Sequence, residues 1–264
     1  MMNLLFASKG FDIFGLHITF YGLLIAVGFI LAILLAFYHA KKRGLTSEDI
    51  IPLAIYVIPL SILGARTYYC IFSGETFSFA EFFAIWNGGM AILGGVIGGV
   101  IAVLIYSIVH QKNFLTICDI AAPSLILGQC IGRVGCYFAG CCYGHEVTNE
   151  SLQFFPISIF TNGGWHLATN FYECFWCLIG LVLLVLLFRK FQQKGVITCC
   201  YLIFYGIGRG IIETFRGDSL YFFSTGLKVS QILAIIIVIV GIIGLILIHN
   251  KYKKQNKNEK VDHK

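Results

Sequence analysis

The chain has 264 residues, of which 58% are hydrophobic and 12% are charged. A soluble domain carries about 25% charged residues, so this composition excludes an ordinary soluble protein and predicts an all-α integral membrane protein. The formal net charge of +6 comes from short basic clusters between apolar runs, and this distribution argues against binding to nucleic acid.

Seven apolar runs have the length of about 20 residues that a helix needs to cross the hydrocarbon core. Pro52 and Pro59 lie in the second run and predict a kink or a late helix start there. Residues 1–17, before the first run, are expected to form a short segment at the membrane interface. The predicted spans are, approximately, 18–39, 50–72, 89–110, 116–138, 171–190, 196–215 and 229–249.

The placement of basic residues predicts the orientation of the chain, because loops rich in lysine and arginine stay in the cytoplasm. Of the 19 lysines and arginines, 13 fall in loops on one side, and six of these lie in the C-terminal stretch 251–264. The N-terminus is therefore expected outside and the C-terminus inside, which is consistent with seven spans. We expect one seven-helix domain, residues 1–250, followed by a basic cytoplasmic tail.

Three arginines lie within the predicted spans, where a charged side chain is costly and usually functional. At about 1.5 Å per helical residue, Arg66, Arg133 and Arg209 all fall in the outer half of the bilayer. The polar groups thus form a layer, whereas a channel or transporter needs them along the whole crossing. A site near the outer leaflet favours a protein that handles lipids.

The sixth run places four polar side chains on one helical face. Tyr205, Arg209, Glu213 and Arg216 are spaced by four, four and three residues. The planar guanidinium group of arginine suits a phosphate, and Glu213 would orient an arginine or handle a proton. The alternative is that Arg209 and Glu213 form an internal pair that only lowers the cost of burial.

The fourth run ends in a stretch rich in glycine and cysteine, residues 128–144. Arg133 lies between Gly132 and Gly135, so it could meet a phosphodiester with help from neighbouring backbone N–H groups. The alternative is an arginine that snorkels from a helix end.

The cysteines of this stretch leave three interpretations open. Cys136, Cys141 and Cys142 could be packed or joined by a disulfide, could include a thiol made reactive by the nearby arginine, or could hold a metal together with His145. Their spacing is not a recognised zinc pattern, so no metal site is predicted. Arg66 is equally open between structural pairing and substrate contact, and Gly88-Gly89 between close helix packing and the lining of a headgroup cavity.

The motifs and their order resemble the prolipoprotein diacylglyceryl transferase family over nearly the whole chain. The resemblance is carried by Tyr21-Gly22-Leu23, Trp86-Asn87-Gly88-Gly89-Met90, Asp119 to Pro123, Gly132-Arg133-Val134-Gly135, Phe171-Tyr172-Glu173, and Tyr205-Gly206 with Arg209, Glu213 and Arg216. It implies a bacterial plasma (inner) membrane enzyme without a cofactor. Such an enzyme moves diacylglyceryl from phosphatidylglycerol, an anionic phospholipid in the bilayer, to a cysteine thiol of a lipoprotein precursor.

The resemblance also implies residue roles. Arg133 and Arg209 would hold the phospholipid, while Tyr21, Tyr205 and Glu213 would support catalysis. We expect other residues to contribute to substrate binding: Gly132, Gly135, Gly88, Gly89, Arg66 and Arg216.

The chain departs from the family pattern at positions where chemistry is expected. Leu93 stands where the resemblance places a histidine, and Cys136 and Cys141 replace an asparagine and a glutamate. Cys141 is therefore a candidate catalytic residue. Two alternatives follow: a divergent relative that moves a lipid moiety to another acceptor, and a non-catalytic lipid-binding membrane protein.

Overall fold

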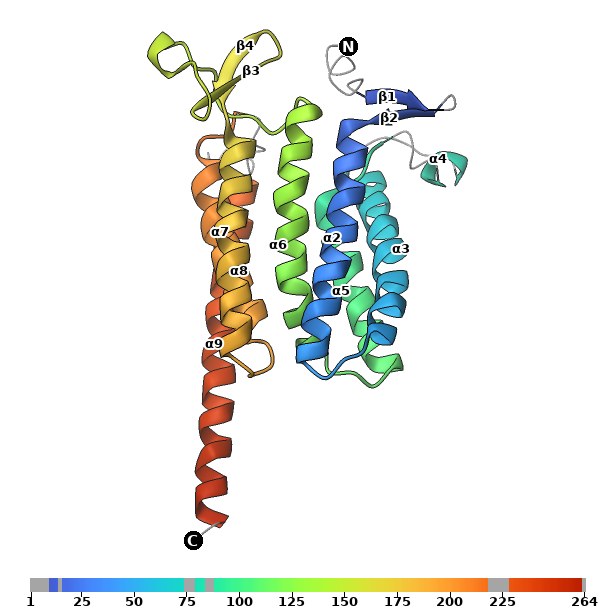
Figure 1. Ribbon diagram of the computed structural model, residues 1–264, viewed down its shortest axis with the longest axis vertical. Helices are drawn as coiled ribbons and strands as arrows, with labels where there is room; N and C mark the ends of the chain where they lie inside the picture. Colours follow the sequence, from blue (N-terminus) through green and yellow to red (C-terminus); the bar gives the residue numbers. More distant parts are fainter. Residues whose placement is uncertain (1–9, 14–15, 74–78, 84–87, 218–227, 263–264) are drawn as a thin grey trace. The chain divides into compact units, whose positions relative to one another are not determined.

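The computed structural model describes residues 10–13, 16–73, 79–83, 88–217 and 228–262 (Figure 1). Within these ranges, seven helices are long and apolar enough to cross a membrane, which confirms the prediction of an all-α protein with seven spans. Each predicted span matches one helix to within three residues, except at the end of the last. The seven are α2 (Phe20–Lys42), α3 (Ser47–Phe72), α5 (Ile92–Val109), α6 (Phe114–Phe138), α7 (Thr169–Lys190), α8 (Val196–Glu213) and α9 (Val229–Asp262).

Within the described ranges, short elements that the sequence analysis did not predict lie before the first long helix and between later ones. β1 (Gly10–Ile13) pairs antiparallel with β2 (Leu16–Thr19), so a hairpin precedes α2, while residues 1–9 of the expected interfacial segment lie outside the described residues. A second hairpin, between α6 and α7, consists of β3 (Ser158–Thr161) and β4 (Gly164–Leu167). The remaining short elements are α4 (Phe79–Phe83) and the 3₁₀ turn η2 (Glu150–Leu152).

The last helix continues from the apolar span into the basic C-terminal stretch. Figure 1 shows α9 extending well past the ends of α7 and α8. The basic tail expected from residue 251 begins within this helix, which runs to Asp262. Lysine, glutamine and glutamate are good helix formers, so the end of the apolar run does not end the helix.

The chain divides into two compact units, of which one comprises residues 36–120. In this unit α3 and α5 pack with their backbones in contact. A Cβ atom on Gly94 would collide with the carbonyl group of Gly64, and one on Gly98 with that of Leu60. This is the small-residue packing of membrane helices.

The other unit comprises residues 1–35 and 121–264. Its helix α8 packs against both α7 and α9. A Cβ atom on Gly208 would collide with the indole ring of Trp176 in α7, which shows how closely these two helices approach. Gln129 of α6 donates a hydrogen bond of 2.8 Å to the hydroxyl of Tyr201 in α8. Direct contacts therefore fix α6, α7 and α8 against one another.

Candidate functional site

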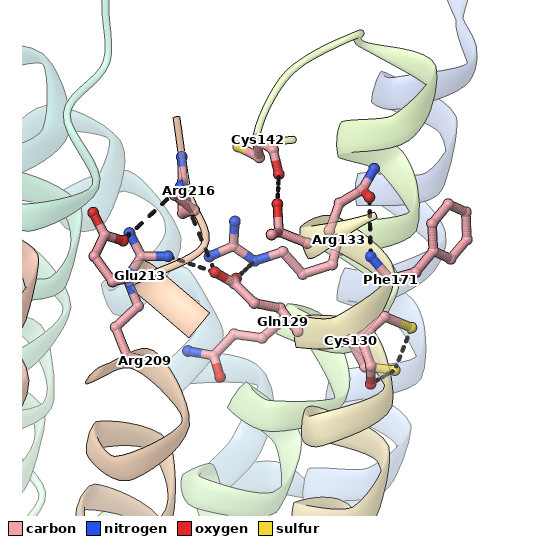
Figure 2. Close-up of polar contacts among 12 residues, drawn as sticks. Gln129, Cys130, Arg133, Cys142, Phe171, Arg209, Glu213 and Arg216 are labelled. Carbon is pink, nitrogen blue, oxygen red and sulfur yellow. Dashed lines mark hydrogen bonds and ion pairs between the residues drawn. The ribbon is translucent and has the colours of Figure 1, made fainter. Parts of the chain in front are cut away.

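The polar face of α8 forms in the structure as its spacing predicts. The Arg209 guanidinium lies 2.8 Å from the carboxylate of Glu213, one helical turn away. Arg216 approaches the same carboxylate oxygen at 3.9 Å from just beyond the helix end. Figure 2 shows Glu213 between these two arginines, so the expected Arg209–Glu213 pair is present and extends to a third member.

A carboxylate from α7 joins this face to α6. One oxygen of Glu173 lies 2.6 Å from Arg209 and 3.8 Å from Arg216. The other oxygen pairs with the Nε–H group of Arg133. Three arginines, one from α6 and two from α8 and the turn that follows it, thus meet at one carboxylate. We call Arg133, Glu173, Arg209, Glu213 and Arg216 the arginine cluster.

Glu173 was not among the predicted site residues, although the sequence carried a signal for it. It is the one carboxylate in the span 169–190, and an ionisable residue inside an apolar span is by default a functional candidate. Its partners could not be named from the sequence, because they lie on α6 and α8.

The arginine cluster has more positive than negative charge. Lys228 is buried and donates hydrogen bonds to the backbone carbonyls of Glu213 at 2.7 Å and Arg216 at 3.0 Å. Among the residues that the structure describes, four cationic side chains therefore gather around two carboxylates. The arginine side chains are 11% to 17% exposed and those of Glu173 and Glu213 are 9% and 2% exposed, so salt screens this charge weakly. The arrangement can attract and hold an anion.

The glycines beside Arg133 let α2 approach α6. A Cβ atom on Gly135 would lie 3.2 Å from the ring of Tyr21, and one on Gly132 would lie 3.6 Å from Ile25. Both glycines are inside α6, where backbone N–H groups bond to carbonyls four residues earlier. The expected help of these N–H groups in binding a phosphate is therefore not available in this conformation.

The two candidate tyrosines lie beside the arginine cluster. Tyr205 stacks on Tyr201 with ring centroids 5.8 Å apart and is close enough to Arg209 and Arg133 to interact with them electrostatically. Tyr21, in the first turn of α2, is 42% exposed. It interacts electrostatically with Arg133 and with the three cysteines at and beyond the end of α6, Cys136, Cys141 and Cys142. Both phenol groups therefore lie near Arg133.

The end of α6 explains how Cys136 and Cys141 meet. The N–H group of Gly140 bonds to the carbonyl of Tyr137, and that of Cys141 to the carbonyl of Cys136, both at 3.1 Å. With Gly140 at a φ of 63°, these bonds form a Schellman motif. In this motif the side chain that follows the left-handed residue contacts the side chain five positions earlier in the helix. The two side chains so joined are those of Cys141 and Cys136.

Cys142 completes a group of three thiols. Its φ is 62° and its carbonyl accepts a hydrogen bond of 2.8 Å from the Thr169 hydroxyl, which fixes the turn (Figure 2). The sulfur atoms of Cys136, Cys141 and Cys142 all lie within 4.8 Å of one another. We call these residues the cysteine trio. The sequence analysis missed one signal. Gly140 is placed to end the helix, and cysteines occupy both positions whose side chains the Schellman motif brings together.

The two cysteines outside the helix differ in acidity. The pKa of Cys142 is well below its usual value, because this sulfur accepts hydrogen bonds from Cys136 and Cys141 and faces Arg133 and Arg216. The pKa of Cys141 is raised, because hydrogen bonding to the neighbouring sulfurs and partial burial both favour its protonated form. Cys142 is therefore the better candidate for an ionised thiol, whereas the sequence analysis singled out Cys141.

Arg66 lies in the unit of residues 36–120 and has a different environment. Its guanidinium donates to four backbone carbonyls, those of Phe82 at 3.1 Å, Gly88 at 2.6 Å, Gly89 at 2.9 Å and Glu81 at 2.6 Å. These contacts favour the structural alternative for Arg66.

Gly88 and Gly89 turn the chain around this arginine. Their φ angles are 81° and 69°, a conformation that suits glycine. A Cβ atom on Gly89 would lie 2.7 Å from the Arg66 guanidinium. Asn87 and Trp86, the preceding residues of the motif, lie outside the described residues. Leu93, at the position of the missing histidine, is exposed in the first turn of α5.

Within the described residues, seven helices of membrane-spanning length and a positively charged cluster among α6, α7 and α8 define a multi-pass membrane protein whose cluster could attract an anion. A family model described as prolipoprotein diacylglyceryl transferase matches residues 9–247. The chain therefore belongs to the prolipoprotein diacylglyceryl transferase family.

Individual relatives agree with this assignment. The phosphatidylglycerol–prolipoprotein diacylglyceryl transferase of Clostridium botulinum (strain Loch Maree / Type A3) is 38% identical over 232 residues, which cover 86% of this chain and 91% of the relative. The proteins of the same name from Streptococcus pneumoniae strains Hungary19A-6 and ATCC 700669 / Spain 23F-1 are 40% and 41% identical over 230 and 229 residues. Each alignment covers 84% of this chain and 86% of the relative.

Proposed function

We propose that this protein is a phosphatidylglycerol–prolipoprotein diacylglyceryl transferase. The observation that carries the proposal is the convergence of Arg133, Arg209 and Arg216 on two carboxylates, with positive charge in excess. The relatives named above act, by their names, on phosphatidylglycerol and a prolipoprotein. A cationic cluster on membrane helices suits the phosphodiester of such a lipid.

Arg133 and Arg209 hold the donor phosphate in this proposal. Guanidinium groups can donate two parallel hydrogen bonds to phosphate oxygens. Glu173 binds both arginines and Glu213 binds Arg209, so the donors are oriented before the lipid arrives. Donors that need no reorganisation stabilise charge in the transition state more effectively.

The reaction is a substitution at a glyceryl carbon. The sulfur of the acceptor cysteine attacks that carbon, a C–S bond forms, and the C–O bond to the phosphate breaks. The electron pair stays on the phosphate oxygen, which leaves as glycerol phosphate, and the thiol proton is released. Negative charge grows on the phosphate during this step, and the arginines stabilise it.

Other residues have supporting roles in the proposal. Tyr21 and Tyr205 border the bound headgroup, and Glu213 positions Arg209 and Arg216. Gly132 and Gly135 shape the wall that α2 and α6 form.

The protein is placed in the bacterial plasma membrane with its N-terminus outside and its C-terminus in the cytoplasm. This orientation rests on the basic residues, because Arg189, Lys190 and Lys194 follow the end of α7 and precede α8, whereas the arginine cluster lies at the opposite end of α8. Under the rule that basic loops remain in the cytoplasm, the cluster lies toward the outer leaflet.

Complementation of a bacterium depleted of its own diacylglyceryl transferase tests the proposal. The wild-type chain should restore growth and lipid attachment to lipoproteins, whereas Arg133→Ala should not. Arg189→Ala, which changes an exposed arginine in the last turn of α7, is the matched control and should behave as wild type. Failure of the wild-type chain despite good membrane expression would contradict the proposal.

A second assay separates the enzyme from the non-catalytic alternative. Purified protein is mixed with vesicles of phosphatidylglycerol and a peptide that carries an acceptor cysteine. Formation of the lipidated peptide supports the transferase. Binding to the vesicles without any lipidated peptide would favour a lipid-binding protein or another acceptor.

A further inference from the structure

The cysteine trio has the geometry of a metal site. The sulfur atoms of Cys136, Cys141 and Cys142 lie within 4.8 Å of one another. Zinc binds thiolate at about 2.3 Å in a tetrahedron, which places two ligand sulfurs about 3.8 Å apart. Side-chain adjustments of about an ångström would bring all three sulfurs onto one ion.

The backbone removes the main objection to such a site. Adjacent cysteines rarely bind one ion, because neighbouring side chains tend to point apart. Here the Schellman motif returns Cys141 to Cys136, and the left-handed conformation of Cys142 returns its sulfur to the same place. The turn is held by Thr169 and does not depend on a metal.

The charge of the surroundings also suits a metal–thiolate group. Three thiolates with one zinc ion carry a net charge of −1. Arg133 precedes Cys136 by one helical turn, and both Arg133 and Arg216 are close enough to Cys142 to interact with it electrostatically. The positive excess of the arginine cluster would offset this negative charge.

The trio supplies three ligands and leaves a fourth position open. Among the described residues, no histidine, aspartate or glutamate joins the group. Structural zinc sites have four protein ligands, whereas catalytic zinc sites have three and bind a substrate or water at the fourth. Cys141 is exposed, so a substrate can reach the open side.

We propose that Cys136, Cys141 and Cys142 bind a zinc ion whose fourth ligand is the sulfur of the acceptor cysteine. This inference rests on the proposed transferase function and adds to it the group that activates the acceptor. Soft thiolate ligands select zinc over magnesium or calcium. The sequence spacing alone predicted no metal site, and the folded turn changes that assessment.

Zinc at this position supplies what the acceptor thiol needs in order to react. A thiol that coordinates zinc is deprotonated, so the acceptor binds as thiolate and its proton passes to water. The thiolate sulfur attacks the glyceryl carbon of the lipid, and the electron pair of the broken C–O bond leaves with glycerol phosphate. The zinc ion is neither oxidised nor reduced. The product thioether is a poorer ligand than a thiolate and can dissociate.

Metal analysis of the full-length protein tests the site itself. Protein purified in detergent from zinc-supplemented cells should contain about one zinc per chain, measured by mass spectrometry of the metal. Cys136→Ser, Cys141→Ser and Cys142→Ser should each lose most of this zinc. Cobalt(II) added to the metal-free protein should produce thiolate-to-cobalt charge-transfer bands, which do not require enzyme activity.

The pair Cys130 and Cys174 provides a matched control. Their sulfur atoms lie 3.4 Å apart between α6 and α7, and they do not belong to the group of three. The double variant C130S/C174S should keep the zinc and the cobalt bands. The thermal unfolding of each variant shows whether it is folded, so that loss of metal is distinguished from loss of structure. Cys141→Ser changes an exposed side chain and is the trio variant expected to disturb folding least.

A peptide titration tests the fourth ligand. A peptide with the acceptor cysteine should raise the cobalt charge-transfer intensity by about one third, since the number of bound sulfurs rises from three to four. The same peptide with serine should leave the spectrum unchanged. A spectrum that the cysteine peptide does not alter would overturn the assignment of the fourth ligand.

Other outcomes separate this inference from the transferase function. Folded wild-type protein that lacks zinc and cobalt bands, or that contains a disulfide within the trio, overturns the metal site. If that protein still lipidates the peptide, the transferase function stands without the metal. Zinc that binds the acceptor thiol without any transfer would instead contradict the proposed function.

Discussion

Arg66 and Arg209 are both arginines in apolar spans, but their partners differ in kind. Arg66 donates to four neutral backbone carbonyls, and this binds residues 81–82 and 88–89 to α3. Arg209 meets the carboxylates Glu173 and Glu213, with further cations close by. The first arrangement satisfies the hydrogen-bond donors of Arg66 and closes a turn. The second retains positive charge and can receive an anion, so we propose that the identity of the partners distinguishes a structural arginine from a binding one.

The largest effect is expected for Arg209→Ala. Loss of a preorganised donor to the phosphate should lower kcat by about 10² to 10³-fold in the peptide lipidation assay. Arg209→Lys should recover little of this loss, because an ammonium group lacks the planar fork. Activity of Arg209→Lys near the wild-type value would show that only the charge matters.

Arg66→Ala should act mainly on stability. The change removes four hydrogen bonds from the guanidinium to part-buried carbonyls, and a hydrogen bond contributes about 1 kcal/mol to stability. We expect a clear fall in the thermal unfolding temperature, while kcat per folded molecule stays within about three-fold of wild type. A large loss of kcat at unchanged stability would contradict the structural role and return Arg66 to the binding residues.

Glu173→Gln should have an intermediate effect, because Glu173 positions the arginines that bind the phosphate. The variant keeps the size of the side chain but loses the charge that holds Arg133 and Arg209. We expect kcat to fall about ten-fold with a smaller change in KM, and Glu173→Asp to recover part of the loss. An unchanged kcat in the glutamine variant would contradict the positioning role.

Gly135→Ala should have the smallest effect of this series. The added methyl group would meet the edge of the Tyr21 ring at 3.2 Å, and this partly exposed ring can move by a few tenths of an ångström. Activity should fall by no more than about three-fold. Gly89→Ala is the comparison. The left-handed backbone at Gly89 and the nearby Arg66 guanidinium leave no space for the added methyl group. The thermal unfolding temperature of this variant should therefore fall more than that of Gly135→Ala.

The sequence by itself determined the spans and the contacts within one helix. Apolar runs of membrane-spanning length predicted all seven long helices, and the spacing of Arg209, Glu213 and Arg216 predicted their contacts. Both follow from local rules, since the rise and the period of a helix are constant along the chain.

The tertiary structure alone decided which side chains from different elements meet. Glu173 joins the arginine cluster because α7 places its carboxylate within reach of Arg133 on α6 and Arg209 on α8, and Arg66 meets neutral carbonyls because the turn at Gly88 and Gly89 presents them to it. The cysteine trio needed a helix-ending turn and a left-handed residue in succession. Hydropathy states that a helix is in the membrane, but it does not state which neighbour each face contacts, because lipid and protein surfaces are similarly apolar.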